Sequence, residues 1–404
     1  MPLFPGWLVV GGAFAVLFVA YGVQYSFGVF FAAMLSEFGW SRGSLGGAFS
    51  LYTFAYCVLG FVAGRLTDRW GPRVVIAAGG VFLGSALAGM SLVTALWQPY
   101  VLYGLVASLG MATAFVPCNS TVVRWFVRRR GLAVGLATSG QSAGMLVGAP
   151  LAQALVSTAG WRTAYAVFGL TALIGLNAVA PLMRRDPESV GLTPDGDPRP
   201  RATVAEPSAG LGDAMRTGAF WALMATFTAT WIPVFVPIIH TVPLARDLGY
   251  SPLIAASLLS ALGAGAVPGR ILIGAASDRI GRKRALGLML LLQALAFVAF
   301  IGANSLAALY AVVGMFGFSY GAVTALFPAM ISDFFGRDRA GSLVGIYFAV
   351  AGAATALGPV GAGAIHDATG SYALAFALSA GCNLAALVAL TLARRPPRVG
   401  SVSR

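Results

Sequence analysis

Twelve long apolar stretches, separated by polar segments, account for most of the chain. Each stretch supplies the roughly 20 apolar residues that a helix needs to cross a bilayer. Because the stretches are long and lack the alternation of a β-strand, they predict membrane-spanning helices and not a β-barrel. We expect these helices at residues 6–34, 45–66, 74–95, 99–123, 131–157, 163–183, 217–245, 252–276, 285–303, 306–331, 341–365 and 371–393.

The composition agrees with a chain that is largely covered by lipid. Hydrophobic residues make up 58% of the 404 positions and charged residues only 10%. A soluble protein of this length needs far more polar surface. The first apolar stretch is too long for the core of a secretion signal, and Met1 to Trp7 carry no Lys or Arg, so we expect no cleavable signal. The sequence therefore predicts an all-α membrane protein.

The basic residues are distributed in a way that indicates membrane topology. All of the 26 Lys and Arg residues except Arg42, Arg162, Arg246 and Arg270 lie in alternate loops or in the C-terminal tail. The positive-inside rule then places these loops and both chain termini in the cytoplasm. We therefore interpret the net charge of +13 as a topology signal in a multi-pass membrane protein, and we expect no nucleic-acid partner.

The sequence lacks the groups that a metal centre or a nucleotide site requires. His240 and His366 are the only histidines, and no cluster of metal ligands accompanies them. The single lysine, Lys283, follows no glycine-rich loop of the kind that binds ATP phosphates. We expect no metal, no cofactor and no enzymatic activity.

Residues 184–216 form the one long polar stretch and separate six predicted helices from six. We expect an N-terminal six-helix bundle at 1–183, a cytoplasmic linker at 184–216, and a C-terminal six-helix bundle with a short cytoplasmic tail at 217–404. The halves match at an offset of 210 residues, in the pairs Asp68-Arg69 and Asp278-Arg279, Gly71 and Gly281, Gly131 and Gly341, and Gly160 and Gly370. Two bundles related by duplication would hold a substrate cavity between them near the membrane midplane.

Two loop segments carry the same motif. Residues 64–73 read Gly-Arg-Leu-Thr-Asp-Arg-Trp-Gly-Pro-Arg, and residues 274–283 read Gly-Ala-Ala-Ser-Asp-Arg-Ile-Gly-Arg-Lys. Both resemble the major facilitator signature G-x-L-x-D-R-x-G-R-[RK], and this resemblance covers the whole chain. An Asp at a helix end can meet arginines or the N-terminus of a neighbouring helix. We therefore expect a conformational latch made of Asp68, Arg69, Asp278 and Arg279. A basic loop that only sets topology would explain the arginines but not the Asp and Gly in both copies.

A narrower resemblance begins before the fifth predicted helix. Residues 125–140, Trp-Phe-Val-Arg-Arg-Arg-Gly-Leu-Ala-Val-Gly-Leu-Ala-Thr-Ser-Gly, resemble the monocarboxylate porter motif [YW]-F-x-[KR]-[RK]-x-x-L-A-x-G-x-A-x-[AS]-G, and oxalate/formate antiporters carry a similar version. Gly135, Gly140, Gly144 and Gly148 would let a neighbouring helix approach closely. Packing alone is an alternative explanation of these glycines.

The chain departs from the animal members of that family. Where they carry a lysine in helix 1, this sequence has Tyr25, and where they carry an Asp one turn before the helix 8 arginine, it has Ala266. These departures point to the bacterial branch of the family and leave the proton pathway open.

Arg270 is the one basic residue that lies inside a predicted helix and away from the loops. It lies eight residues before Asp278, which is roughly 12 Å from the helix end at 1.5 Å per residue. A cation there costs about 2.5–3.5 kcal/mol on insertion scales, so it should face a cavity or a partner. We expect Arg270 to bind an anionic substrate, with a structural ion pair as the alternative. The resemblance agrees, since the matching arginine binds the carboxylate in monocarboxylate porters. The position 210 residues earlier is Gly60.

Other lining residues are weaker expectations. By resemblance, helices 1, 4, 7 and 10 line the cavity, and the polar or aromatic residues at suitable depths are Tyr25, Thr113, Phe115, His240 and Tyr320, together with Gln141 on helix 5. Each of them could instead serve packing or face lipid.

A single arginine suits a single carboxylate, because one guanidinium makes one bidentate pair. Helix 11, from Gly341 to Ile365, holds no second cation for a dianion such as oxalate. We therefore expect a secondary transporter, a functional monomer, for monocarboxylates such as lactate, pyruvate, propionate or acetate, coupled to a proton. All thirteen acidic residues lie in loops or near helix ends, and Asp247 and His240 are the proton candidates. The alternatives are an anion exchanger of the oxalate/formate type, a drug/proton antiporter and a transporter-like carboxylate sensor.

Overall fold

The computed structural model describes residues 4–40, 42–196, 211–336, 340–355 and 357–394, and all regular structure in these ranges is helical. Ten helices there are long and apolar enough to cross a membrane. One of them, α6 (Arg130–Val179), turns at Gly160 and therefore supplies two crossings. The pair α14 (Ala340–Ala354) and α15 (Leu357–Thr369) supplies one more. The predicted twelve transmembrane helices are thereby confirmed.

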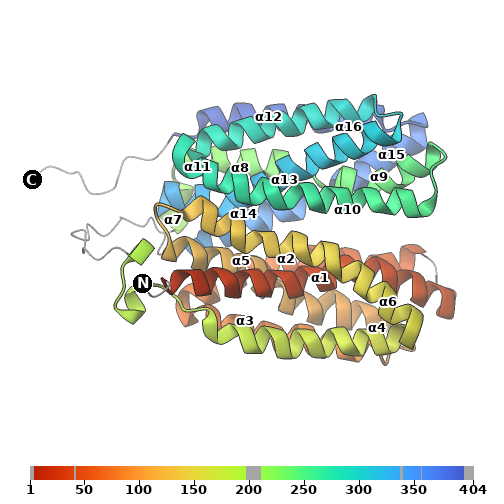
Figure 1. Ribbon diagram of the computed structural model, residues 1–404, viewed down its shortest axis with the longest axis horizontal. Helices are drawn as coiled ribbons and strands as arrows, with labels where there is room; N and C mark the ends of the chain where they lie inside the picture. The colour runs from red at the N-terminus through yellow and green to blue at the C-terminus, as the bar shows by residue number, and fades with distance from the viewer. Residues whose placement is uncertain (1–3, 41, 197–210, 337–339, 356, 395–404) are drawn as a thin grey trace, which may run out of the picture. The chain divides into compact units, whose positions relative to one another are not determined.

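The chain divides into two compact units, of which unit 1 comprises residues 1–127, 136–200 and 340–349. Its first three helices are α1 (Gly6–Phe38), α2 (Arg42–Trp70) and α3 (Pro72–Met90). The fourth crossing combines α4 (Trp97–Pro99), a π-helical segment (Tyr100–Ala107) and α5 (Ser108–Trp125). Helix α5 packs against α1, α2 and α3, so it forms the centre of this unit (Figure 1).

Unit 2 comprises residues 128–135, 201–339 and 350–404. Its helices up to the eighth crossing are α7 (Leu211–Met215), α8 (Gly218–Trp231), α9 (Phe235–Asp247), α10 (Pro252–Pro268), a π-helical segment (Gly269–Ile273) and α11 (Gly274–Ile280). Then follow α12 (Arg282–Ile301), α13 (Leu306–Phe335) and α16 (Ala373–Leu392). Helix α12 packs between α13 and α16, and α13 packs on α10 (Figure 1).

The predicted division into residues 1–183, 184–216 and 217–404 stays a prediction. Part of the predicted linker, residues 197–210, lies outside the described residues. The same holds for several arginines used in the topology prediction, namely Arg199, Arg201, Arg337, Arg339, Arg395, Arg398 and Arg404. The short segments 128–135 and 340–349, at the starts of α6 and α14, each belong to the unit that is built mainly from the other half.

Backbone geometry repeats at the offset of the duplication. Gly71 and Gly281 have φ angles of 83° and 90°, and Gly160 and Gly370 have φ angles of 79° and 69°. Gly39 and Gly249, also 210 residues apart, form a third such pair with φ angles of 65° and 85°. Glycine reaches this left-handed region without the steric cost that a side chain brings. The spacing of glycine turns is thus the same in both halves.

Two helix crossings repeat in the same way. A Cβ atom on Gly64 would overlap the carbonyl oxygen of Gly341, and a Cβ atom on Gly274 would overlap that of Gly131. Gly64 and Gly274 are 210 residues apart, and so are Gly131 and Gly341, so one backbone-to-backbone crossing occurs once in unit 1 and once in unit 2. Contacts this close need glycine on both helices.

Two of the predicted membrane-spanning helices are interrupted near their middle. The helix expected at 217–245 breaks between Trp231 and Phe235, where Pro233 cannot donate a backbone hydrogen bond. The helix expected at 341–365 breaks between Ala354 and Leu357. A Cβ atom on Gly358 would overlap the carbonyl oxygen of Ile232, so the two interruptions pack against each other. Breaks in spanning helices are typical of transporter sites.

Candidate functional site

Arg270 lies in the π-helical segment Gly269–Ile273, directly after Pro268. The proline lacks an N–H group and crowds the preceding turn, which favours a wider helical turn here. The Arg270 side chain is buried, with an exposed fraction of 1%. The position of this cation within a spanning segment agrees with the prediction, and its role in binding stays a prediction.

Glycines bring Arg270 close to α13. A Cβ atom on Gly269 would overlap the carbonyl oxygen of Phe318, and one on Gly321 would overlap that of Ala266. Because the two backbones touch, the Arg270 Cζ atom lies 5.7 Å from the centre of the half-buried Tyr320 ring. A guanidinium at this distance from an aromatic ring is within the range of a cation–π interaction. The structure thus brings together two of the predicted site residues.

The glycines of α6 confirm the predicted close approach of neighbouring helices. A Cβ atom on Gly135 would overlap the carbonyl oxygen of Arg270 in unit 2. In unit 1, the glycines at positions 140, 144 and 148 make equally close contacts with the backbone of α1. Arg270 therefore sits on a backbone that touches its neighbours on two sides, which restricts where its side chain can go.

In unit 1, Phe115 stacks on Phe348 of α14 with ring centres 4.8 Å apart, and both side chains are buried. Thr113 donates a 2.7 Å hydrogen bond from its hydroxyl to the carbonyl oxygen of Gly110, and its side chain packs against Gly79. This contact favours the packing alternative for Thr113.

Two further predicted lining residues also belong to unit 1. The ring of Tyr25 is half-buried, and its centre lies 6.0 Å from that of Tyr21 on α1. Gln141 is buried on α6, with an exposed fraction of 4%. The participation of both residues in a substrate site stays a prediction.

The two proton candidates lie in one polar cluster of unit 2. The buried His240 has its Nδ1 atom 3.3 Å from the Tyr372 hydroxyl. His366 stacks on the other side of the cluster, with its ring centre 4.2 Å from that of Tyr372. Its Nε2 atom lies 3.9 Å from Oδ2 of Asp247, whose side chain is 60% exposed. We call these four residues, His240, Tyr372, His366 and Asp247, the histidine cluster. The cluster extends from the buried His240 to the exposed Asp247.

Asp68, which we predicted to be part of a latch, contacts the start of α14 in unit 1. Its carboxylate accepts hydrogen bonds from the backbone N–H groups of Gly341 and Ser342 at 3.1 and 2.8 Å, and from the Ser342 hydroxyl at 2.6 Å. It also forms an ion pair with the buried Arg124. A carboxylate at the start of α14 meets the positive end of the helix dipole. Asp68 thus meets both an arginine and a helix N-terminus, and its role as a latch stays a prediction.

Asp278 repeats this arrangement in unit 2. It accepts hydrogen bonds from the backbone N–H groups of Gly131 and Leu132 at 2.8 and 3.1 Å, at the start of α6. Arg282 pairs with Asp278 at 2.8 Å and with Asp333 at 2.9 Å, and Asp333 also pairs with Arg130. The chain of alternating charges is therefore longer here than around Asp68.

The arginines predicted for the latch are not the ones in these ion pairs. Arg69 and Arg279 are exposed at the ends of α2 and α11. The partners are instead Arg124, Arg130 and Arg282, which the charge distribution alone assigned to topology. Motif spacing identified the carboxylates, and Arg282 follows Asp278 by four residues within the same motif. Arg124 and Arg130 come from distant segments of the chain, and only the packing of their helices brings them near the carboxylates.

Comparison with known proteins agrees with this geometry. A sequence profile of the Major Facilitator Superfamily matches residues 13–239 and again residues 232–404. Monocarboxylate transporter 13 of Bos taurus is 29% identical over 376 residues, which cover 93% of this chain and 86% of that protein. Monocarboxylate transporter 3 of Rattus norvegicus is 31% identical over 380 residues, which cover 93% and 76% of the two chains.

A solved structure supports the fold. The proton:xylose symporter XylE, bound to 6-bromo-6-deoxy-D-glucose, superposes with a TM-score of 0.78 over 95% of this chain and 94% of its own, at 16% sequence identity. The fold is therefore that of a multi-pass membrane transporter with twelve helices in two six-helix bundles, and not that of an enzyme. Within this class, the chain belongs to the monocarboxylate porter family of the Major Facilitator Superfamily.

Proposed function

We propose that this transporter carries small monocarboxylates, such as lactate, pyruvate, propionate or acetate, together with a proton by alternating access. The names of the two mammalian relatives, which each align with 93% of the chain, support the substrate class. The distribution of arginines supports cytoplasmic termini in a bacterial inner membrane. The transporter would act as a monomer, since each chain carries both bundles.

The buried cation of the eighth crossing carries this proposal. Arg270 has an exposed fraction of 1% in a segment that spans the membrane. A cation at such a position costs about 2.5–3.5 kcal/mol on insertion scales, and binding of an anion would offset this cost. The planar guanidinium can donate two parallel hydrogen bonds to one carboxylate. Tyr320, at 5.7 Å, would hold the guanidinium from one face.

Aromatic side chains suit the remainder of a short acid. The stacked pair Phe115 and Phe348 offers a buried apolar surface for an alkyl group. Tyr25, Thr113, Gln141 and His240 remain candidates for the polar contacts that would distinguish lactate from acetate. We propose that Arg270 selects the charge of the acid.

The proton would bind to the histidine cluster. Histidine is the side chain that ordinarily changes charge between pH 5 and 8, and both histidines of the chain lie here with Asp247. An exposed carboxylate at one end and the buried His240 at the other supply an entry point and a protected binding point. Tyr372, between the two imidazoles, can both accept and donate a proton.

Uptake into proteoliposomes tests this function. An inward acid gradient should drive accumulation of labelled lactate in empty vesicles, because the proton and the anion enter together. An imposed membrane potential should change uptake little, since no net charge crosses. Labelled oxalate should be carried poorly, because one arginine pairs with only one of its carboxylates. Uptake that responds to preloading with unlabelled lactate and not to pH would overturn symport and leave exchange.

The proton site has a separate test. Asp247→Asn should remove the accumulation driven by an acid gradient while exchange of labelled for unlabelled lactate continues, because exchange needs no net proton movement. Arg162→Gln, a charge change at an exposed residue of unit 1, is the control and should leave both modes unchanged. Acid-driven accumulation at the normal level in Asp247→Asn would remove this carboxylate from the pathway.

A further inference from the structure

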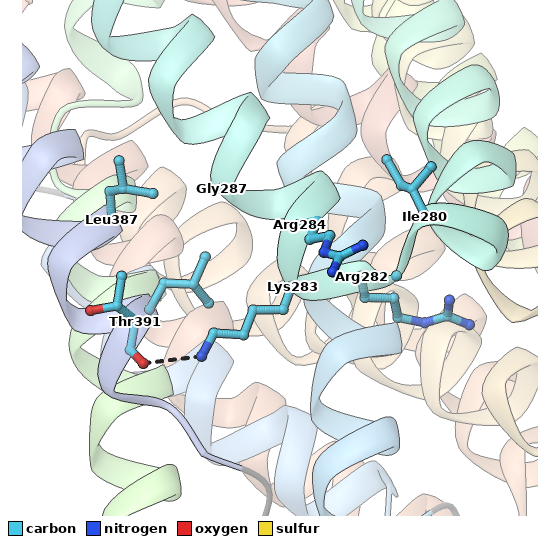
Figure 2. Close-up of a pocket in the computed structure, with 9 residues that line it drawn as sticks. Ile280, Arg282, Lys283, Arg284, Gly287, Leu387 and Thr391 are labelled. Atoms are coloured by element: carbon cyan, nitrogen blue, oxygen red, sulfur yellow. Dashed lines mark hydrogen bonds between the residues drawn. The ribbon is translucent and has the colours of Figure 1, made fainter.

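A pocket of about 480 Å³ opens where α12 begins and α16 ends. Its lining includes three consecutive basic residues of α12 and, facing them, residues of the last turns of α16, namely Arg282, Lys283, Arg284, Gly287, Leu387 and Thr391 (Figure 2). No acidic residue is among the described residues that line it. The pocket is not part of the site around Arg270 or of the histidine cluster.

The side chains of the three basic residues make different contacts. Arg282 points away from Thr391, and its guanidinium pairs with Asp278 and Asp333 (Figure 2). Lys283 reaches across the pocket, and its Nζ atom donates to the carbonyl oxygens of Thr391 and Ala393 at 3.0 and 2.8 Å. These carbonyls are neutral, so the charge of Lys283 is not cancelled. Arg284 is exposed, and Figure 2 shows its guanidinium directed toward Ile280, at the side of the pocket away from Thr391. Two positive charges therefore act on the pocket.

The walls next to these charges are apolar. Leu387 and Leu390 line the pocket, and Leu288 and Val388, the chain neighbours of Gly287 and Leu387, are 56% and 62% exposed on helices that are long and apolar enough to span the membrane. A positive group at the end of a spanning helix, with exposed apolar side chains below it, matches a molecule with an anionic head and an apolar tail. A free anion would leave the apolar side unused.

This pocket is not a feature of the duplicated fold. At the corresponding positions of the first half, 210 residues earlier, Arg284 is replaced by Val74, Gly287 by Ala77 and Leu387 by Asn177. Only Lys283 has a basic counterpart, Arg73. The space beside Gly287 is open enough that a Cβ atom there would reach Leu387 Cδ1 only at 3.4 Å.

We propose that this pocket binds the phosphate headgroup of an anionic phospholipid, with Lys283 and Arg284 facing the phosphate and the acyl chains lying along α12 and α16. Basic pockets between transmembrane helices at a membrane surface recognise such headgroups. Bound lipid would tie the start of α12 to the end of α16 next to the charge network of Arg282. The site is independent of the substrate that the transporter carries.

Binding of a fluorescent phosphatidylglycerol to the purified full-length protein in neutral detergent tests the proposal. We expect saturable binding that is tighter than that of the equally labelled phosphatidylcholine. Arg284→Gln should weaken it about fivefold, the effect of one basic residue near a lipid surface. Arg73→Gln, which removes an exposed charge at the matching loop of the other half, should leave it unchanged.

Two more arms distinguish the occupants. Gly287→Leu adds no charge and fills the pocket, so it should abolish saturable binding while elution volume and unfolding temperature stay near those of the unchanged protein. Inorganic phosphate at millimolar concentration should not displace the lipid. Equal binding of the two lipids, equal effects of Arg284→Gln and Arg73→Gln, or displacement by inorganic phosphate would each overturn the lipid site. Should Gly287→Leu fail to fold, the comparison of the two arginine variants decides.

Discussion

Residues 60–68 and residues 270–278 occupy corresponding places in the two halves, but their side chains differ at one end and agree at the other. At the Asp end, Gly64 and Asp68 repeat the contacts of Gly274 and Asp278 with the N-terminus of a neighbouring helix. At the other end, Gly60 lies against the Phe348 ring, and a Cβ atom on it would come within 2.9 Å of Phe348 Cδ1.

In the sequence, the positions 210 residues from Gly60 and Phe348 are Arg270 and Thr138, so the second copy has a cation where the first has glycine, and a small polar residue where the first has a ring. The repeated end holds helices together at short distance. We expect the substrate-binding residue at the end where the copies differ, because function depends on particular sites and not on the fold that both copies share. In the first copy the position of Arg270 is a glycine that lies against an aromatic ring.

The largest expected effect is at Arg270. Arg270→Ala and Arg270→Lys should both reduce lactate uptake about 100-fold or more, because a charge-assisted hydrogen bond contributes about 1.5–3 kcal/mol and lysine lacks the bidentate geometry. Uptake into proteoliposomes at equal protein density is the measurement. Arg65→Lys, at an exposed residue of α2, should transport normally. Normal uptake by Arg270→Lys would show that Arg270 makes no bidentate contact with the substrate. The difference between Gly60 and Arg270 would then concern helix packing alone.

The next effect concerns stability, and it separates the two ends of the comparison. Gly64→Ala places a methyl group on the Gly341 backbone, which cannot move aside, so we expect a loss of about 1–3 kcal/mol and a lower unfolding temperature in detergent. Gly60→Ala meets only the edge of the Phe348 ring, which can turn, so its loss should be clearly smaller. Equal losses for both variants would show that the crossing at Gly64 is looser than its glycines indicate.

The sequence was sufficient for the number of helices and for the duplication, because both depend on composition and on spacing along the chain. The 210-residue offset identified Gly71, Gly160 and Asp68 with their counterparts, and the structure adds Gly39 and Gly249. These are local properties. An apolar stretch of sufficient length forms a spanning helix whatever the order of its apolar residues, and a glycine turn depends only on the backbone angles of the glycine.

The partners across helices could not be predicted in the same way. Arg124 and Arg130 have the same residue type and loop position as the exposed Arg69, so charge patterning cannot separate them. The histidine cluster could not be predicted for the same reason. His366 and Tyr372 come from α15 and the start of α16, more than a hundred residues after His240. The break after Trp231 was easier to predict from the sequence, because Pro233 disrupts the helical hydrogen bonding there.

A moderate effect is expected at the Asp end. Asp68→Asn should slow uptake several-fold and change equilibrium binding of lactate less than about twofold, because the latch alters the balance of conformations and does not touch the substrate. Asp278→Asn should slow it less, since Arg282 keeps Asp333 at 2.9 Å. Rates of uptake and equilibrium binding measured on the same preparations give both values. Binding weakened about tenfold in Asp68→Asn, with an unchanged conformational balance, would contradict the latch.

The smallest effect should come from Ser342→Ala. The Ser342 hydroxyl donates to Asp68 at 2.6 Å, and the residue at the matching position of the other copy is Leu132, which has no hydroxyl. The variant therefore gives Asp68 the set of backbone donors that Asp278 already has, two N–H groups at a helix start. Uptake should slow less than in Asp68→Asn, because the carboxylate, the helix dipole and the Arg124 ion pair all remain. An uptake rate as low as that of Asp68→Asn would mean that the Ser342 hydroxyl, and not the repeated backbone contact, is what makes this latch work. The two copies would then resemble each other at their Asp ends in sequence but not in function.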